Sequence, residues 1–251
     1  MSLATVVRIR QGLMAVGDQP GPLIGAGRSA DIYDIGHDRV LRRFRSDYDT
    51  RREADLMIYL AQAGYPVPAV YDASGRDIVM QRLEGRDMVA AIGRRPWLAR
   101  SYGRILADLH NRLHQIDAPA GTRPAFEAGD KVVHLDLHPA NVMLTARGPM
   151  VIDWSNAAAG APAADVAMAY VIVASSETDL LPGPVRAVVA PVRAAALRQF
   201  LASVRDDPGP VLASAARYRM SDINIRPSEV KKLQQIAARA ASQHPGRQAA
   251  S

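Results

Sequence analysis

The stretch "HLDLHPANVMLTARGPMVIDW", residues 134–154, sets three polar residues among apolar ones that are typical of buried structure. These residues are Asp136, Asn141 and Asp153. Burying a carboxylate or a carboxamide costs free energy unless a partner satisfies it, and a hard cation is a common partner. We therefore expect the three side chains to belong to one site, which restricts the folds open to the chain.

The segments around these residues read as short strands, over 131–136, over 142–145 and from 148 onward. If the last two form a hairpin, Asn141 at the start of one strand and Asp153 at the end of the other come together. They can then supply oxygens to one cation, and Mg²⁺ suits this best because it takes few protein ligands and leaves positions for phosphate oxygens and water. Asp136 is left over and can accept a proton from an attacking hydroxyl, which indicates phosphoryl transfer.

Patterning elsewhere predicts two lobes of different composition. Residues 22–33 and 38–44 read as three strands, 50–63 as a helix and 67–83 as two further strands. Beyond this segment the pattern becomes helical, beginning with a long amphipathic helix that has Pro96 near its first turn. We predict an α+β chain with an N-lobe of residues 1–84, built on an antiparallel sheet, and a larger, mainly helical C-lobe of residues 85–251.

The segments "HLDLHPANVML" and "VIDW" resemble the catalytic and metal-binding segments of the aminoglycoside phosphotransferase and choline kinase group. Asp136, His138 and Asn141 match the D-x-H-x-x-N loop of that group, and Asp153-Trp154 takes the place of the protein-kinase Asp-Phe-Gly. The resemblance runs from about residue 22 to 170. It implies a protein-kinase-like fold and the transfer of the γ-phosphate of ATP to a hydroxyl of a small molecule. It also implies Asp136 as the catalytic base, with Asn141 and Asp153 as Mg²⁺ ligands.

The N-terminal segments match the same group in order, so the resemblance implies a nucleotide-binding N-lobe. "IGAGRSADIY" occupies the place of the kinase glycine-rich loop, where backbone N–H groups around Gly25, Gly27 and Ser29 would approach ATP phosphates. An ordinary glycine hairpin turn explains this stretch equally well. Glu53 stands at the position of the helix-C glutamate, with an exposed helix residue paired to a nearby arginine as the equal alternative. "IVMQRLEG" resembles the inter-lobe hinge.

In the inter-lobe hinge that the resemblance implies, adenine would bond the backbone around Gln81 and Leu83.

Departures from the group bear on activity. Kinases of this fold hold the ATP phosphates with a lysine on the third strand, whereas "RVLRRF" offers Arg42 or Arg43. Strand alternation turns only one of them to the cleft, and Arg42 aligns with the lysine. Arginine keeps the positive charge but is bulkier and planar, so the substitution is not conservative.

Two further departures lie in the C-lobe. Leu135 stands where the group often has glycine, and "AGAPAADVA" lacks the acid often found after the glycine. Asp165 nevertheless stands where a following aspartate supports the catalytic loop in the group. The segment "LADLH", ending at His110, matches a structural helix motif of the group, and we assign it no chemistry.

His134 and His138 are four residues apart, a spacing that suggests a zinc pair on a helix. Pro139 and the expected loop argue against a continuous helix here. We therefore expect both imidazoles to pack and hydrogen-bond within the catalytic loop and to orient Asp136 or its neighbours.

Composition excludes several classes of protein. Cysteine is absent, which excludes disulfides and thiolate metal sites and favours a cytoplasmic location. Basic residues interrupt the N-terminal apolar stretch and no long uncharged apolar run occurs, so we expect neither a signal peptide nor a membrane span. The net charge is +6, but zinc-finger spacing, RNA-binding aromatic motifs and a clear helix-turn-helix are missing, so nucleic acid is not the expected partner. The oligomeric state stays open.

The leading interpretation is a small-molecule O-phosphotransferase that uses ATP and Mg²⁺, with a hydroxylated small molecule as its partner. The main alternative is a pseudokinase, a nucleotide-binding or scaffold module, which Arg42 at the lysine position motivates. A protein kinase is disfavoured because no Ala-Pro-Glu-like ending follows Asp153. The C-terminal half carries many arginines and few aromatics, so a polycationic antibiotic is not the natural acceptor.

Overall fold

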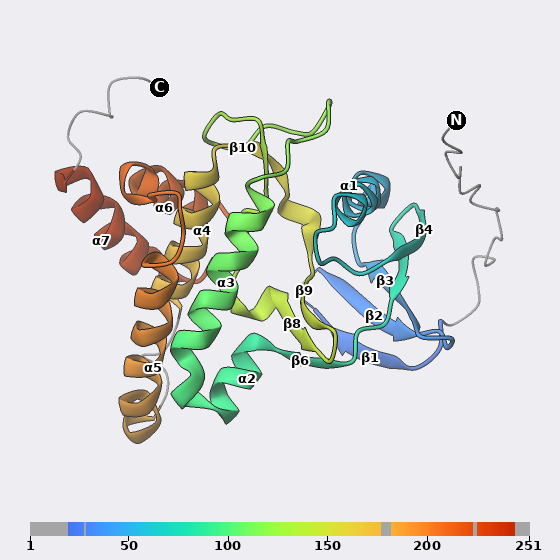
Figure 1. The fold of residues 1–251 in the computed structure, drawn as a ribbon, viewed down its shortest axis with the longest axis horizontal. Helices are drawn as coiled ribbons and strands as arrows, with labels where there is room; N and C mark the ends of the chain where they lie inside the picture. The colour runs from blue at the N-terminus through green and yellow to red at the C-terminus, as the bar shows by residue number, and fades with distance from the viewer. Residues whose placement is uncertain (1–19, 28, 177–181, 223–224, 244–251) are drawn as a thin grey trace. The chain divides into compact units, whose positions relative to one another are not determined.

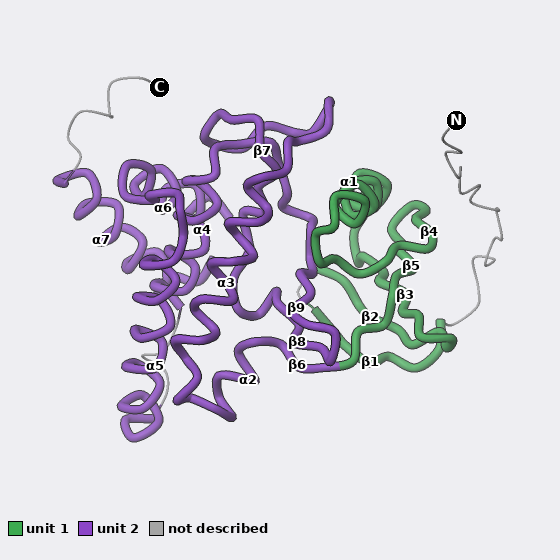
Figure 2. The backbone as a smooth tube through the Cα atoms, in the orientation of Figure 1, with its two compact units in different colours: residues 1–84 green, residues 85–251 purple. Residues whose placement is uncertain are grey.

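The structure is a computed structural model that describes residues 20–27, 29–176, 182–222 and 225–243. The chain divides into two compact units, Met1–Glu84 (unit 1) and Gly85–Ser251 (unit 2), shown in Figure 2. The predicted α+β class is confirmed, because unit 1 is built on an antiparallel sheet and helices dominate unit 2. The N-terminal stretch on which the signal-peptide prediction rests, residues 1–16, lies outside the described residues.

Unit 1 is a five-stranded antiparallel sheet with one helix, and its strand order is β1-β2-β3-β5-β4 (Figure 1). The succession of strands and helix along the chain agrees with the sequence pattern. Its elements are β1 (Leu23–Ala26), β2 (Ala30–Asp34), β3 (Arg39–Phe44), α1 (Thr50–Gln62), β4 (Val70–Ser74) and β5 (Asp77–Gln81).

Local sequence explains the position of α1 in unit 1. The helix begins after Asp49, whose carboxylate accepts the backbone N–H of Arg51 at 3.2 Å. It ends before Gly64, which has a φ of +76° and so adopts a conformation that favours glycine. The sheet packs on a buried cluster of Ala30, Val40, Phe44, Ile78 and Met80.

Unit 2 combines helices with two small antiparallel sheets, one pairing β10 with β7 and the other of order β6-β8-β9 (Figure 1). Pro96–Leu98 forms a 3-10 turn, so the long helix predicted around Pro96 begins only at Ala99. The elements are β6 (Gly85–Asp87), α2 (Met88–Arg94), α3 (Ala99–Leu113), β7 (Lys131–Val133), β8 (Val142–Thr145), β9 (Gly148–Val151), β10 (Ala158–Gly160), α4 (Pro162–Ser175), α5 (Gly183–Leu201), α6 (Leu212–Met220) and α7 (Pro227–Gln243).

Two packing arrangements fix the surroundings of the candidate site. Helix α3 lies against α5 at Gly103, where an added Cβ would meet the Ala196 carbonyl oxygen at 2.3 Å, so the close approach requires glycine. A second buried cluster joins β7 to α4, α6 and α7. Its buried members are Val133, Leu135, Ala158, Ala167, Met168, Val171, Val211, Ala215, Ala216 and Leu233.

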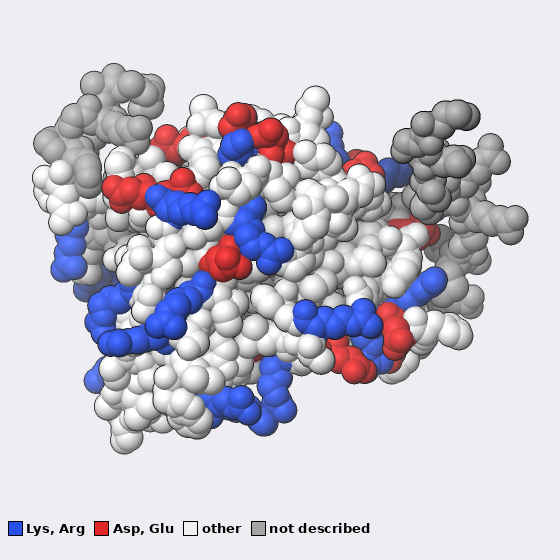
Figure 3. All heavy atoms as spheres, viewed as in Figure 1, with Lys and Arg blue, Asp and Glu red and all other residues white. Residues whose placement is uncertain are grey.

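Among the described residues, every helix is too short or too polar to cross a bilayer. On the face drawn in Figure 3, lysine and arginine side chains lie in separate patches with acidic side chains between them.

Candidate active site

The β8–β9 hairpin brings Asn141 and Asp153 to one end of unit 2. Val142 pairs with Val151, and the backbone carbonyl of Asn141 accepts the N–H of Ile152 at 3.0 Å. Asn141 therefore directly precedes one strand while Asp153 closely follows the other. The predicted hairpin is confirmed.

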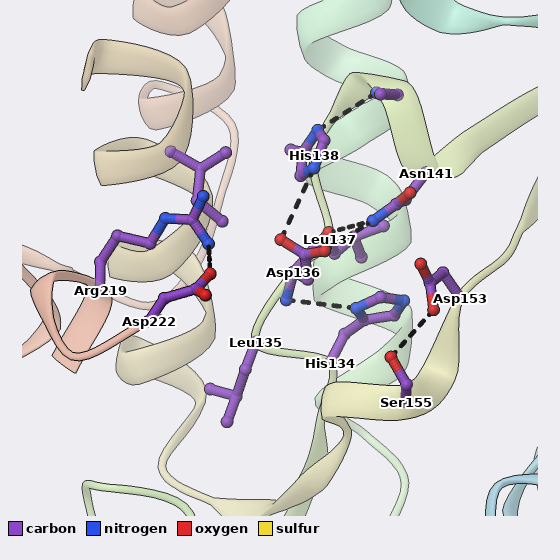
Figure 4. Close-up of polar contacts among 12 residues, drawn as sticks. His134, Leu135, Asp136, Leu137, His138, Asn141, Asp153, Ser155, Arg219 and Asp222 are labelled. Carbon is purple, nitrogen blue, oxygen red and sulfur yellow. Dashed lines mark hydrogen bonds and ion pairs between the residues drawn. The ribbon is translucent and has the colours of Figure 1, made fainter. Parts of the chain in front are cut away.

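Asp136 joins this pair through Asn141. The Asn141 Nδ2 donates to the backbone oxygen of Asp136 at 2.8 Å and to its carboxylate Oδ2 at 3.1 Å (Figure 4). This leaves the carboxamide oxygen of Asn141 directed away from Asp136. Asp153 Oδ1 accepts a hydrogen bond from the Ser155 hydroxyl at 2.9 Å. The structure thus brings together the three side chains singled out in the sequence.

The side-chain oxygens of Asn141 and Asp153 are suitable ligands for a hard cation such as Mg²⁺. A carboxamide oxygen and a carboxylate stand at one hairpin end, and hard cations take oxygen ligands of these types. Asp153 adopts a φ of +65°, which is unfavourable for a residue with a side chain. Backbone strain of this kind concentrates at functional sites, where the surrounding structure holds it in place. The residues present are therefore suited to a divalent ion.

The surroundings of Asp136 raise the pKa of its carboxyl. Burial raises the pKa of the Asp136 carboxyl, and the negative charge of Asp153 adds to the effect, while His134 and Arg219 act in the opposite direction. A carboxylate with a raised pKa accepts a proton more readily, which suits a general base.

The backbone on both sides of Asp136 is held by buried side chains. The N–H of Leu135 donates to Asp165 Oδ1 at 2.6 Å, and the Nε2 of His110 lies 3.1 Å from the carbonyl oxygen of Leu137. Leu135 has a φ of +62°, a conformation that glycine takes at little cost. Leu135 therefore adopts a left-handed backbone conformation that is typical of glycine, and the hydrogen bond from its N–H to Asp165 stabilises this conformation.

His114 links Asp165 to a second acid, Asp206. Its Nε2 lies 3.1 Å from Asp165 Oδ2, and its Nδ1 lies 3.0 Å from Asp206 Oδ2. Burial alone would lower the pKa of His114, but the hydrogen bonds to the two carboxylates outweigh it and raise that pKa to about 9. Burial would raise the pKa of Asp165, yet the nearby imidazoles of His110, at 3.5 Å, and His114, at 3.1 Å, hold it well below its usual range. The cluster is thus a set of ionic contacts that supports the loop carrying Asp136.

His110, His114 and Asp165 also lie close enough together to be considered as metal ligands. Metal binding requires a neutral imidazole with a lone pair. Both nitrogens of His114 are already directed at carboxylates, at 3.0 Å from Asp206 and 3.1 Å from Asp165. This group supports the loop through hydrogen bonds instead.

His134 and His138 form hydrogen bonds with the backbone of the loop that carries Asp136. The Nδ1 of His134 accepts the backbone N–H of Asp136 at 3.2 Å, and its Nε2 lies 3.1 Å from the carbonyl oxygen of Ile152. Burial lowers the pKa of His134, so the neutral ring can accept at one nitrogen and donate at the other. His138 Nδ1 accepts the N–H of Ala140 at 3.3 Å. The prediction that these imidazoles bond within the loop is confirmed.

In unit 1, the segment with Gly25, Gly27 and Ser29 forms the β1–β2 hairpin. Gly27 closes the turn by donating its N–H to the carbonyl of Ala30 at 2.8 Å, and an added Cβ on Gly27 would lie 3.1 Å from that same oxygen. Arg28 lies outside the described residues. The hairpin turn is therefore present, and phosphate binding by its backbone stays a prediction.

Arg42 and Glu53 form a buried ion pair within unit 1. Arg42 Nη1 donates to Glu53 Oε1 at 2.7 Å, and the side chains are only 8% and 1% exposed. The alternative of an exposed Glu53 is wrong. Arg43 points to the other face of β3, where its Nε and Nη2 bond the Asp77 carboxylate at 2.8 and 2.7 Å. The expected strand alternation holds, with Arg42 as the residue that meets the helix glutamate.

The predicted adenine-binding residues also lie in unit 1. Gln81 ends β5, and its side-chain oxygen accepts the N–H of Ala69 at 3.4 Å. Leu83 follows this strand and is half-buried. Unit 1 therefore holds all of the predicted nucleotide-binding residues, and unit 2 holds the predicted base and metal ligands.

Sequence reasoning missed His114, Asp206 as its partner, and Arg219 near Asp136. His114 caps the C-terminal end of α3, four residues after His110, so this spacing was an available signal for a shared face. Asp206 is 92 positions from His114 and Arg219 is far from Asp136, and nothing local in the sequence marks either pairing.

The antiparallel sheet of unit 1 and the mainly helical unit 2, with its loop and hairpin, are those of a protein-kinase-like fold. The sequence pattern of the phosphotransferase enzyme family matches residues 21–131 and 127–206, together well over half of the chain. The chain belongs to this family and is by class a phosphotransferase. No curated protein matches the chain closely enough to be assigned as a relative.

Solved structures share this fold at low sequence identity. A choline/ethanolamine kinase family protein from Mesorhizobium loti is 14% identical with a TM-score of 0.55, covering 88% of this chain and 87% of its own. The gentamicin complex of the aminoglycoside phosphotransferase APH(2")-IIa is 15% identical with a TM-score of 0.59, covering 90% and 91%. The amicoumacin kinase hAmiN, in complex with AMP-PNP, Ca²⁺ and Ami, is 12% identical with a TM-score of 0.51, covering 89% and 88%.

Proposed function

We propose that the chain transfers the γ-phosphate of ATP to a hydroxyl group of a small molecule in a Mg²⁺-dependent reaction. The observation that carries the proposal is the contact of Asn141 Nδ2 with Asp136 Oδ2 at 3.1 Å, beside the hairpin end that holds Asp153. Neighbours of the same fold include a streptomycin–ATP complex and the AMP-PNP and Ca²⁺ complex, which supports a nucleotide and a divalent cation as cofactors. A cytoplasmic location belongs to the same proposal.

Asn141 and Asp153 would hold the cation in this reaction, and a bound Mg²⁺ would neutralise charge on the phosphate oxygens. Asp136 would accept the proton of the attacking hydroxyl at its carboxylate. The N–H of Leu135, the carbonyl of Leu137 and the side chain of Asn141 are all engaged, so the carboxylate of Asp136 is held in position. Positioning of this kind supplies a large part of the catalysis in phosphoryl transfer.

Arg42 is proposed to replace the lysine that holds the nucleotide phosphates in kinases of this fold, with Glu53 orienting it. Gly25, Gly27 and Ser29 would offer backbone N–H groups to phosphate, and the backbone around Gln81 and Leu83 would bond adenine. The buried Arg42–Glu53 pair at 2.7 Å supports this role, because an arginine at that position keeps both the charge and the ion pair.

A pseudokinase remains the second candidate, and Arg42 is the observation that favours it. Arginine is bulkier than lysine, so nucleotide could bind in a geometry that does not react. An intact Asp136, Asn141 and Asp153 cluster argues for turnover, because a scaffold has no need of it.

ATP consumption against a panel of hydroxylated small molecules tests the proposal. We expect ADP release that requires both an acceptor and Mg²⁺ and that is abolished by EDTA. ATP binding without turnover, together with higher ATP affinity but no turnover in Arg42→Lys, would support the pseudokinase. Absence of both Mg²⁺-dependent ATP binding and turnover would defeat the proposal.

A further inference from the structure

Two helical segments that meet in unit 2 carry arginines and no acidic residue. Residues 88–107, which run from α2 into α3, and residues 182–205, which contain α5, each hold four arginines and neither aspartate nor glutamate. Helix α3 lies against α5 at Gly103, and residues of α2, α3 and α5 line one small hollow that includes Met88 and Leu197. Figure 1 shows α2 and the first turns of α3 and α5 at the same end of unit 2. The two segments therefore contribute to one surface.

Six arginines of this surface are exposed and lack an acidic partner. They are Arg94, Arg95, Arg100, Arg104, Arg186 and Arg198. Their guanidinium groups form neither a hydrogen bond nor an ion pair within the part of the chain that the structure describes. By contrast, Arg43, Arg45 and Arg82 of unit 1 are each paired with an aspartate. Glu177 and Asp179, which precede α5, lie outside the described residues. Positive charges without neighbouring negative ones attract an anionic partner and repel a cationic one.

Large apolar side chains stand among these arginines. Of the eight large hydrophobic side chains exposed in the described residues, four belong to the two segments, namely Val89, Trp97, Val185 and Val188. Trp97 is 75% exposed, although tryptophan is a highly buried residue type on average. Exposed apolar surface rimmed by polar residues marks sites of protein or membrane interaction. The surface is therefore suited to a partner that offers negative charge and an apolar environment together.

We propose that this surface binds an anionic phospholipid membrane, with the six arginines on the lipid phosphates and Trp97 among the headgroups. Tryptophan concentrates at the boundary between membrane and water, and each arginine close to an anionic membrane adds attraction. Peripheral binding becomes stable when two such signals act together, and here charge and apolar side chains supply both. Binding of this kind needs no spanning helix, and it does not depend on the proposed function.

The same observations disfavour a nucleic acid and a second copy of the chain. Protein–DNA interfaces are more polar than protein–protein interfaces, and their contacts go to phosphates, sugars and base edges, which leaves Trp97 and the three valines without a role. A symmetric dimer formed through this surface would place the arginines of one copy opposite those of the other, and like charges in contact are unfavourable. A membrane satisfies both the charge and the apolar side chains.

Intrinsic fluorescence of the full chain tests the proposal, because the chain contains only two tryptophans. Trp154 is 1% exposed, so a change on adding vesicles reports on Trp97. The vesicles are of phosphatidylcholine alone, or of phosphatidylcholine mixed with phosphatidylglycerol. With the mixed vesicles we expect emission to move to shorter wavelength and the chain to co-sediment, with both effects weakened by salt. Binding to phosphatidylcholine alone should be about tenfold weaker or less detectable still.

Paired substitutions give the matched comparison for charge. The double variant Arg94→Gln and Arg95→Gln should weaken binding to the mixed vesicles about tenfold or more, because each arginine near the membrane contributes. The double variant Arg51→Gln and Arg52→Gln removes two adjacent exposed charges from α1 of unit 1 and should change the affinity less than about twofold. Thermal unfolding of each variant shows that it is folded.

A second pair of substitutions tests the apolar contribution. Trp97→Ala should weaken co-sedimentation with the mixed vesicles and abolish the fluorescence shift. Leu23→Ala, at an exposed apolar residue of unit 1, should leave both unchanged. Neither change touches a residue of the proposed catalytic site, so ADP release by these variants in solution should stay that of the unaltered chain.

The other outcomes overturn the proposal. Absence of a fluorescence shift and of co-sedimentation with the mixed vesicles does so, as does equal binding to phosphatidylcholine alone. Equal losses in the two arginine pairs would mean that net charge alone acts, without this surface. Binding of duplex DNA, or a dimer that buries Trp97, with no binding to vesicles, would assign the surface to that partner instead.

Discussion

The imidazole Nε2 of His114 lies 3.1 Å from the carboxylate of Asp165, and neither side chain is more than 2% exposed. Asp165 also accepts the backbone N–H of Leu135 at 2.6 Å. The same carboxylate therefore contacts both His114 and the residue that directly precedes Asp136. An ionised Asp165 is stable in the core because His110 and His114 face it. The geometry of the proposed catalytic loop therefore depends on the buried cation His114, the residue that directly follows α3.

This cation makes stability depend on pH. The pKa of folded His114 is about 9, above the value of 6.5 for an unperturbed histidine, so its charge stabilises the fold fully below about pH 6.5. The contribution falls as pH rises and is lost above about pH 9, and a shift of this size corresponds to a free energy on the order of 3 kcal/mol. We expect His114→Gln to be destabilised on that order in mildly acidic solution and much less at alkaline pH.

Urea unfolding of the variant and the unaltered chain across this pH range measures the effect. His37→Gln, at an exposed histidine of unit 1, is the control and should show a small difference that does not vary with pH. A stability difference for His114→Gln that is constant from acidic to alkaline pH would refute the role assigned to its charge.

Leu135→Gly tests the competition between burial and backbone strain. Leu135 is 2% exposed, so removing its side chain costs about 2–5 kcal/mol, whereas releasing a non-glycine residue from left-handed φ recovers about 1–2 kcal/mol. We expect a net loss on the order of 2 kcal/mol in unfolding free energy. Leu137→Gly is the control because Leu137 is fully buried without a positive φ, and it should lose more. Equal losses in denaturant unfolding would show that strain at Leu135 is negligible.

Arg42→Met should destabilise the chain far more than Arg43→Met. Removing Arg42 takes the guanidinium from a carboxylate that is 1% exposed, a change that typically costs about 3–5 kcal/mol. Arg43 and Asp77 are 33% and 28% exposed, so losing that pair should cost about 1 kcal/mol or less. Thermal unfolding of the two variants compares them directly. Similar melting temperatures would mean that the Arg42–Glu53 pair contributes little.

The sequence was sufficient to predict the fold and the central loop because the signals are local. Asp136 and Asn141 are five positions apart, and the strand patterns around "ARG" predict the hairpin that carries Asp153 to Asn141. Alternation along β3 predicted that only one of Arg42 and Arg43 faces the cleft, and the resemblance to the kinase lysine position selected Arg42, which is the arginine paired with Glu53.

The ionic contacts that support the loop could not be predicted in the same way. His114 meets Asp206 across 92 positions, and that contact depends on how α3 packs against the segment after α5. Arg219 lies beside the loop that carries Asp136 (Figure 4), on helix α6, which packs on the buried cluster that contains Leu135. Sequence periodicity shows which face of a helix is buried, but it does not show which distant segment that face meets.

Single-turnover kinetics of Asp136→Ala, compared with the unaltered chain at saturating Mg²⁺ and ATP, tests most directly whether Asp136 is the base beside a metal-bound nucleotide. We predict a fall in the rate of phosphoryl transfer of about a hundredfold or more with unchanged ATP affinity, whereas Asp153→Ala should weaken Mg²⁺-dependent ATP binding itself. A rate for Asp136→Ala within about threefold of the unaltered chain, far less than removal of a general base costs, would contradict the mechanism.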